Sequence, residues 1–155
     1  MTQAGPPPPP QVTELKLTDA IKQLVNGAFA DGKPILFAYV NPDGQPSLSF
    51  RGSAHAHSDT QLAVWVRNPD GGFLKAVGQN NRVTLMYRDP ATRTQYFFQG
   101  RAMIDNSPAV RDRVYDESPE PERNADPQKR GSAAVVDLFR VEGGTPGQRI
   151  RMERA

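Results

Sequence analysis

The stretch QPSLSFRGSAHAHSDTQLAVWVRNPDGGFLKAVGQNNRV (Gln45–Val83) decides the fold. It contains two strand-like runs, an Asn-Pro-Asp-Gly-Gly break, and a short helix that ends at Asn-Asn-Arg-Val. Arg67 closes the second run just before the break. Free backbone amides at the start of a helix attract anions, so this arginine and the amides that follow it predict a binding position for a phosphate group.

The overall composition indicates one ordinary soluble domain. The chain has 155 residues, of which 37% are hydrophobic, and a formal net charge of +2, which is typical of a single domain with a core. Cysteine is absent, so disulfides, thiolate metal sites and cysteine nucleophiles are excluded. Acidic and basic residues nearly balance, so we expect no nucleic-acid partner. No run is apolar enough for a membrane span and the N-terminus lacks a signal pattern, so we expect no membrane association and a cytoplasmic location.

The two ends of the chain differ from its centre. Five consecutive prolines, Pro6–Pro10, predict a disordered tail over residues 1–12 with polyproline II character. The alternative is a ligand for a proline-recognition domain. We expect residues 13–145 to form the folded domain and residues 146–155 to form a short basic C-terminal tail.

Hydrophobic periodicity and turn signals predict a mainly β (α+β) chain. The first helix is expected over residues 18–30, with Thr18 as its N-cap, and two further helices over 72–78 and 108–117. Strands are expected over 35–40, 46–55, 61–67, 82–88, 93–105 and 133–141, with a surface loop over 118–131. Turn signals between the strands favour antiparallel pairing, so the predicted fold is a six-stranded antiparallel β-barrel with flanking short helices.

The predicted strand 46–55 alternates between polar and apolar residues. Ser47, Ser49, Arg51 and Ser53 lie on one face, and Leu48, Phe50, Gly52 and Ala54 on the other. The polar face is either plain solvent surface or the wall of a polar ligand site. Small hydroxyls beside one arginine would let a planar ligand approach the backbone closely.

Three other features are candidates for chemistry. His55 and His57 share one strand face and could begin a metal site, or could simply face solvent at a strand end. Trp65 could pack on an aromatic ligand, or could be a core or interface residue. The most suggestive group is Arg67, Asn68, Gly71, Gly72 and Lys75, in which glycines permit close approach and cations favour an anion. A nucleophile elbow and a Walker loop are both absent, so hydrolase chemistry has little support.

Taken together, these segments resemble the pyridoxamine 5'-phosphate oxidase-like, FMN-binding split-barrel proteins. The resemblance covers about Thr18 to Val141. It rests on the strand motif from Gly44 to Ser53, on Trp65-Val66-Arg67-Asn68, on Asn80-Asn81-Arg82-Val83, and on Gln95-Tyr96 followed by Gly100-Arg101-Ala102. It implies a split barrel and a homodimer with FMN at each of two subunit interfaces.

The resemblance also implies roles for individual residues. Ser49, Phe50, Arg51 and Gly52 would line the flavin ring, and Val66 and Arg67 would contact the ribityl phosphate. Gln95 matches a family glutamine that reaches the flavin bound mainly by the partner subunit. The full set of expected cofactor-binding residues is Ser49, Phe50, Arg51, Gly52, Val66, Arg67, Asn68, Gly72, Lys75 and Gln95.

This chain departs from the true pyridoxamine phosphate oxidases at their phosphate-binding cations. Ser49 stands where those enzymes begin the motif with arginine, and Gly71-Gly72-Phe73 stands where they have a Ser-Arg-Lys run. Arg67 and Lys75 are the candidates to replace the missing cations. The C-terminal segment that binds pyridoxal phosphate in those enzymes also has no counterpart, so vitamin B6 oxidation is not expected.

The function that this resemblance implies is a flavin-dependent oxidoreductase. It would use FMN, or alternatively a deazaflavin, with a reduced nicotinamide or deazaflavin donor and a small-molecule substrate that the sequence does not identify. The alternative is a split-barrel protein that binds flavin or haem, or acts in a stress response, without turnover.

Overall fold

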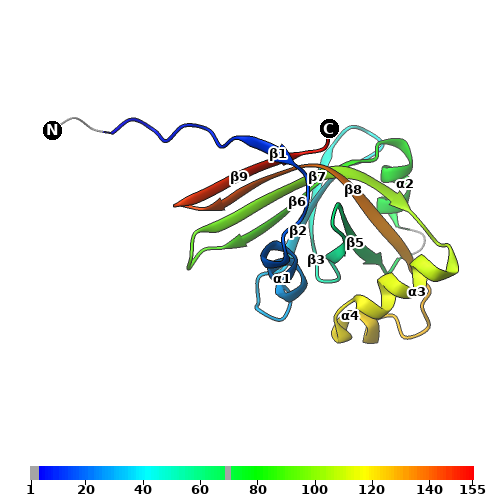
Figure 1. The fold of residues 1–155 in the computed structure, drawn as a ribbon. Coiled ribbons are helices and arrows are strands. Elements are labelled where there is room, and N and C mark those ends of the chain that lie inside the picture. The colour runs from blue at the N-terminus through cyan, green and yellow to red at the C-terminus, as the bar shows by residue number, and fades with distance from the viewer. Residues whose placement is uncertain (1–3, 69–70) are drawn as a thin grey trace.

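The structure is a computed structural model that describes residues 4–68 and 71–155. Over these residues, nine strands form one curled sheet, and helices α2, α3 and α4 gather toward one end of it (Figure 1). The strands are β1 (Val12–Glu14), β2 (Ile35–Val40), β3 (Pro46–Arg51), β4 (His55–Ser58), β5 (Gln61–Val66), β6 (Arg82–Asp89), β7 (Thr94–Ile104), β8 (Ser132–Thr145) and β9 (Gln148–Glu153). The helices are α1 (Asp19–Gly27), α2 (Gly72–Gln79), α3 (Pro108–Glu117) and α4 (Glu120–Asn124).

The sheet is mixed and does not close into a full barrel. Its main path is β1-β9-β8-β7-β6-β2-β3, and β5 leaves this path by pairing with β8 on one side and β4 on the other. Among the described residues, neighbouring strands pair antiparallel except β1 and β9, which pair parallel. Consequently β3 and β4, which follow each other in the chain, lie at two different edges of the sheet. The barrel is therefore open between them.

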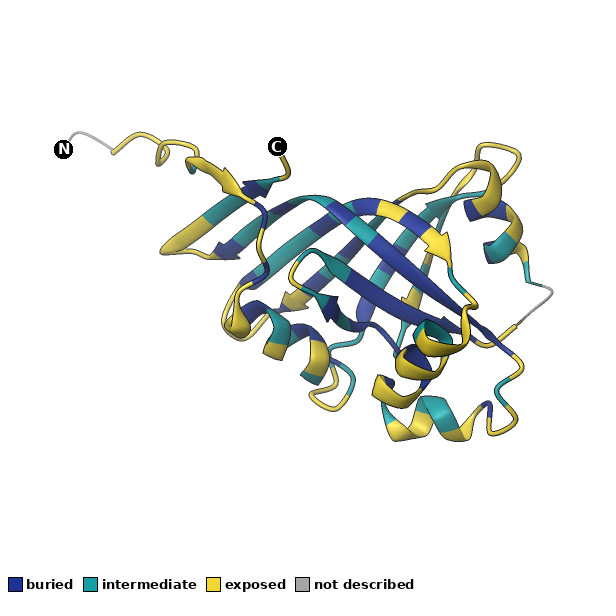
Figure 2. Ribbon diagram, turned by 45° about the vertical axis from the view of Figure 1, so that its right-hand side comes forward, coloured by how far each residue is buried: buried dark blue, intermediate teal, exposed yellow. Residues whose placement is uncertain are grey.

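The main core fills the concave side of the sheet. Phe37 of β2, Leu85 of β6 and Phe98 of β7 are fully buried there, and α1 closes this side with Ile21 and Val25. Thr18 caps α1 as predicted, because its hydroxyl accepts a hydrogen bond from the Ile21 amide at 3.2 Å. In Figure 2, β8 shows as a mostly buried strand that crosses the middle of the molecule.

A second, smaller core lies on the other face of β5. Trp65 and Ala63 pack there against Val114 and Tyr115 of α3. Leu62, Val64 and Val66 of the same strand face the main core, as the alternation of the sequence predicted. Strand β5 is thus buried on both faces and fixes α3 relative to the barrel.

Several predicted boundaries need correction. The prediction of six strands was wrong, since the described residues contain nine, and the antiparallel pairing fails at β1 and β9. The predicted strand 46–55 is two strands separated at Gly52–Ala54, which is where the barrel splits. The expected C-terminal tail contains β9. This strand pairs with the end of β8, and β8 itself continues beyond Gly143 and Gly144. The expected loop over 118–131 contains α4.

Some predictions were confirmed, and others concern residues outside the described part of the chain. Helices α2 and α3 match the predicted ranges closely, with Pro108 opening α3. Residues 1–3 of the expected tail, and Pro69 and Asp70 of the expected break, lie outside the described residues, so the tail stays a prediction. No helix within the described residues is long and apolar enough to cross a membrane.

Candidate functional site

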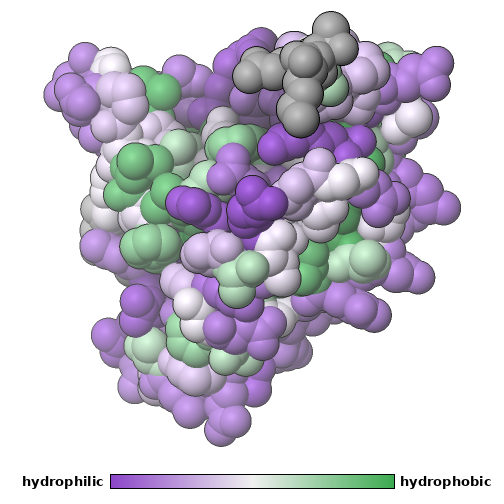
Figure 3. Space-filling view, turned by 90° about the vertical axis from the view of Figure 1, so that its left-hand side faces the viewer, coloured by the Kyte–Doolittle hydropathy of each residue, from purple (hydrophilic) through white to green (hydrophobic). Residues whose placement is uncertain are grey.

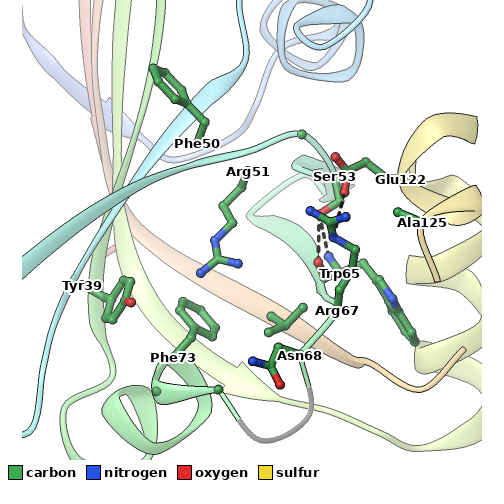
Figure 4. Close-up of a pocket in the computed structure, with 14 residues that line it drawn as sticks. Tyr39, Phe50, Arg51, Ser53, Trp65, Arg67, Asn68, Phe73, Glu122 and Ala125 are labelled. Atoms are coloured by element: carbon green, nitrogen blue, oxygen red, sulfur yellow. Dashed lines mark hydrogen bonds and ion pairs between the residues drawn. The ribbon is translucent and has the colours of Figure 1, made fainter.

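A cavity of about 500 Å³ lies beside the segment that joins β3 to β4. Its walls come from the ends of β3 and β5, from the start of α2, and from α4 (Figure 4). Seven of the ten predicted cofactor-binding residues line it: Phe50, Arg51, Gly52, Val66, Arg67, Asn68 and Gly72. The chain thus brings most of the predicted set together in one place.

The polar face of β3 is turned inward, and its last residue, Arg51, lines the cavity. Ser47, Ser49 and Arg51 are half-buried, whereas Leu48 and Phe50 on the opposite face are 65% and 68% exposed. The register of β3 with β2 explains this, because Ser49 pairs with the buried Phe37. The polar face is thus less exposed than the apolar one, and its role as the wall of a ligand site stays a prediction.

Arg51 extends into the cavity toward the start of α2 (Figure 4). Its guanidinium carbon lies 4.7 Å from the centre of the Phe73 ring, and its Nε atom is buried with no hydrogen-bond partner among the described residues. Burial lowers the pKa of the Arg51 guanidinium; Tyr39 and Glu122 oppose that shift, and the Arg67 charge adds to it. The group stays cationic, because an arginine in a protein does not lose its proton. The cavity therefore holds a positive charge with unused hydrogen-bonding capacity.

Helix α2 begins beside this arginine. Phe73 fixes its position, since the ring packs edge-on against Phe37 at 5.3 Å and Tyr39 at 5.1 Å. Gly71 is the N-cap residue, and among the described residues no side chain caps the helix. The positive end of the helix dipole therefore lies on the cavity wall next to Arg51.

Arg67 lies at the rim of the cavity and pairs with an acid. Its Nε is 3.8 Å from Oε2 of Glu122 on α4, and its side chain is 56% exposed against 16% for Glu122. The sequence analysis assigned the phosphate to Arg67, but in the structure this charge is partly neutralised. The two arginines of the cavity thus differ: Arg67 is exposed and paired, and Arg51 is half-buried and, among the described residues, has no ion pair.

A hydrogen-bond network around Trp65 holds α4 and the cavity wall in place. The Trp65 indole N–H donates to Oδ2 of Asp126 at 2.9 Å, and the same carboxylate accepts from the amides of Arg130 and Gly131. Burial would raise the pKa of Asp126, but these three hydrogen bonds outweigh it and lower the pKa. Ser53 bonds both backbone groups of Trp65 through its hydroxyl. Trp65 is 2% exposed, so it is mainly a core residue, although it also borders the cavity.

Three predicted residues do not line the cavity. Ser49 is half-buried on β3, and its buried hydroxyl has no partner among the described residues. Lys75 is exposed on α2. Gln95 lies on β7, where with Phe97 it lines a separate hollow of about 190 Å³. Within one chain, Gln95 therefore does not meet the other predicted residues, and its role stays a prediction.

His55 and His57 belong to β4 and lie outside the cavity, on the side near α3. Nδ1 of His55 is 2.7 Å from the Ser53 carbonyl oxygen, and its Nε2 is 3.7 Å from Glu117. Burial lowers the pKa of both His55 and His57. No cluster of three or more metal-ligating side chains occurs among the described residues, so nothing there supports a metal site.

Neither the family models nor the curated proteins contain a match to this sequence. Solved structures do match it. A pyridoxamine 5'-phosphate oxidase-related, FMN-binding protein of Nostoc punctiforme is 17% identical, with a TM-score of 0.66 over 88% of this chain and 90% of that one. HupZ of group A Streptococcus is 18% identical, with a TM-score of 0.63 over 83% of this chain and 97% of that one. The general stress protein 26 of Bacillus anthracis is 12% identical, with a TM-score of 0.62 over 84% and 98%.

This chain has the fold of the pyridoxamine 5'-phosphate oxidase-like split barrels. The predicted resemblance is confirmed at the level of the fold. The similarity extends over most of this chain and nearly all of the neighbouring proteins.

Sequence reasoning missed several cavity residues. Tyr39 and Phe73 were assigned only to a strand and to a helix core, and Glu122 and Ala125 fell in the expected loop. A signal for α4 was present, because the Ser-Pro-Glu-Pro-Glu run places proline and acids where a helix begins. Nothing in the sequence indicated that this short helix reaches the cavity.

Proposed function

We propose that this split barrel binds FMN in the cavity and acts as a flavin-dependent oxidoreductase. The single observation that carries the proposal is the position of Arg51, a cation whose buried Nε has no hydrogen-bond partner among the described residues, beside the start of α2, which no described side chain caps. Guanidinium groups and helix N-termini are the two protein groups that best bind phosphate. The Nostoc protein of the same fold, which is described as FMN-binding, adds support.

The residues present fit a flavin mononucleotide. Arg51 and the first amides of α2 would hold the phosphate, and Val66, Gly52 and Phe50 would border the ring. The cavity of about 500 Å³ falls within the range of small-molecule sites. A bound flavin would supply hydride or electron transfer, while the chain would supply charge neutralisation, orientation and exclusion of water.

The residue that we assign to bind the phosphate differs from the one expected from the sequence. Arg67 was expected to anchor it with help from Lys75, but Arg67 pairs with Glu122 and Lys75 does not line the cavity. We therefore assign the anchoring role to Arg51 and a position at the rim to Arg67. Lys75 retains at most a long-range effect, because an exposed charge is screened.

We also propose that a second copy of the chain covers the cavity. The outer face of the sheet carries an apolar row of Phe50, Leu36, Met86 and Phe97 across four adjacent strands. A hollow of about 330 Å³ lies on this face, and Phe50 lines both the hollow and the cavity. Hydrophobic patches also reach the surface on the side where the β6–β7 and β8–β9 hairpins end (Figure 3). Exposed apolar area of this kind marks interaction sites, and Gln95 beside Phe97 would then approach the flavin of the partner.

Light scattering of a Leu48→Glu variant tests the homodimer. Leu48 is 65% exposed in one copy, so the substitution should leave folding intact and should dissociate the dimer at micromolar concentration. Val12→Glu, at an exposed position on β1, is the matched control and should remain dimeric. A wild-type protein that is monomeric, or a Leu48→Glu variant that stays dimeric, would contradict this interface.

The function itself is tested on the purified protein. It should show the visible absorption of a flavin, and mass spectrometry should identify FMN in the material released on denaturation. Anaerobic addition of NADPH or a reduced deazaflavin, followed by quinone or oxygen, should then give repeated cycles of reduction and reoxidation. FMN binding without turnover would favour a binding protein, and failure to bind added FMN would reject both functions.

A further inference from the structure

Two arginines lie opposite each other on the outer face of the sheet, and neither of them lines the flavin cavity. Arg82 opens β6 and is the direct partner of Arg101 of β7 in the ladder that joins these strands. Both residues are exposed. Like charges at directly opposite positions of two strands destabilise a sheet. The fold therefore loses stability at this pair, and a bound anion would reduce the repulsion.

The ring of Phe139 holds both arginines at one place. The guanidinium carbon of Arg82 is 5.6 Å from the centre of this ring, and that of Arg101 is 5.3 Å from it. The ladder of β7 with β8 shifts its register after Gln99, which leaves Phe139 as the extra residue on β8. A bulge of this kind redirects the side chains of its strand and is common beside binding sites. The sheet is thus locally irregular where an aromatic ring meets two cations.

Phe139 also borders two hollows in the surface. The larger has a volume of about 470 Å³, and the described residues that line it include two arginines and no acid. Arg82 contributes a charge to its lining, and Thr84 and Gln99 contribute polar groups. Val40 and Phe139 contribute apolar surface. This hollow therefore combines positive charge, hydrogen-bonding groups and an apolar wall.

The acids of the neighbouring strands decide which hollow suits an anion. Asp137 is the ladder partner of Arg101, and its Oδ1 accepts a hydrogen bond from Nε2 of Gln61 at 2.7 Å. It lines the smaller hollow, of about 400 Å³, where its charge would repel an anion. Glu153 lies beside the larger hollow but pairs with Arg140, with Oε1 and Nε 3.0 Å apart. The larger hollow is therefore the favoured position.

We propose that the larger hollow beside Phe139 binds a small organic anion, a compound with a phosphate or carboxylate group on an apolar body. Arg82 and Arg101, both placed on the Phe139 ring, would attract the charged group. The apolar body would lie along Val40 and Phe139. Guanidinium groups are well suited to bind phosphate and carboxylate. This site is separate from the flavin cavity, so the inference goes beyond the proposed function.

NMR titration of the ¹⁵N-labelled full chain tests the site with three probes: phenyl phosphate, benzoate and the uncharged benzamide. At least one of the two anions should shift the Nε–H signals of Arg82 and Arg101 until saturation, and the tighter of the two identifies the preferred charged group. Benzamide should leave these signals in place. Arg82→Gln should weaken binding of the preferred anion about five- to tenfold, and Arg101→Gln should weaken it in the same direction.

The matched control is Arg88→Gln. It removes the same charge from the same strand and the same face, but Arg88 lies opposite Gln95 rather than another arginine. This variant should bind the preferred anion as the wild type does. Thermal melting verifies that each variant is folded, and Arg101→Gln carries the test if Arg82→Gln does not fold.

The proposed homodimer interface lies on the same outer face, so a second copy of the chain is the competing occupant of the hollow. Shifts that appear only in the Leu48→Glu variant would show that the partner covers the hollow in the wild type, and they would overturn the proposal. Equal anion affinity in the wild type and Arg82→Gln, or an equal response to benzamide, would also overturn it. None of these results depends on whether the protein binds a flavin.

Discussion

Two neighbouring regions of this split barrel differ in whether their buried polar groups are hydrogen-bonded. In the Trp65 network, formed by Trp65, Ser53, Tyr115 and Asp126, each of these side chains makes a hydrogen bond. At the Arg51 cavity and on the strand that borders it, Arg51 Nε and Ser49 Oγ are buried without partners among the described residues. An unsatisfied buried group costs about 1–3 kcal/mol. The comparison indicates that the first region stabilises the fold, and under the proposed function a bound ligand would complete the second.

The largest expected effect is on the stability of the Trp65 network. Asp126→Ala leaves an indole N–H and two backbone amides without their acceptor, so the free energy of unfolding should fall by about 2–4 kcal/mol. Urea denaturation measures this. The control is Asp112→Ala, whose exposed carboxylate pairs with Lys129 on the surface and should cost under about 1 kcal/mol. Equal losses in the two variants would show that the network is not a special source of stability.

The sequence predicted the network only in part. The sequence predicted the helix over 108–117 and the strand over 61–67, close to the observed α3 and β5, which pack on each other in the smaller core. The partner of Trp65 could not be predicted, because Asp126 is separated from it by 61 residues and lies in a segment without hydrophobic period. Long-range pairings of this kind depend on tertiary packing rather than on local pattern.

The cavity shows the same limit. Alternation in the 46–55 segment gave the two faces of β3 correctly, and Phe50, Arg51 and Gly52 indeed meet Val66 and Arg67. The pattern alone left open which face would be buried, because a strand at a sheet edge can carry its apolar residues outward. Nor did it show which arginine would be paired, since Glu122 approaches from a helix that was expected to be a loop. The short strands β1 and β9 were missed because β1 is only 3 residues long and β9 is rich in charge.

The pH dependence of stability is the next largest expected effect. Burial lowers the pKa of His55. The Ser53 carbonyl and Glu117 oppose this shift, and His57 and Arg113 add to it. A lowered folded-state pKa means that the unfolded chain binds the proton more readily. Stability should therefore fall as the pH drops below about 6.5, by at most about 1.4 kcal/mol per pH unit for one histidine.

Unfolding of wild type and His55→Gln between pH 7.5 and 5.5 measures this effect. The slope should be smaller in His55→Gln, and His57, whose pKa burial also lowers, should account for the remainder. Asp126 does not contribute in this window. Its pKa is lowered, so its stabilisation is lost only as the pH falls below the unfolded value of about 3.9. A stability that is flat across the window would contradict the assignment.

The smallest expected effect on stability is the difference between two serine substitutions, at Ser53 and at Ser49. The Ser53 hydroxyl bonds both the amide and the carbonyl of Trp65, so Ser53→Ala should cost about 1–2 kcal/mol. The Ser49 hydroxyl is buried without a partner among the described residues, so Ser49→Ala should change stability by less than about 0.5 kcal/mol, or raise it. Chemical denaturation of the two ligand-free variants side by side gives the difference. A loss for Ser49→Ala as large as that for Ser53→Ala would remove the contrast between the two regions.

Binding of FMN and riboflavin to the wild type and to Arg51→Gln tests the central claim most directly. A charge-assisted bond to phosphate is worth about 1.5–3 kcal/mol, so FMN should bind Arg51→Gln roughly 10–100-fold more weakly, while riboflavin affinity stays the same. Arg130→Gln, at an exposed position on the loop before β8, should bind both ligands as the wild type does. Equal FMN affinity in wild type and Arg51→Gln, or a wild type that does not distinguish FMN from riboflavin, would contradict the account.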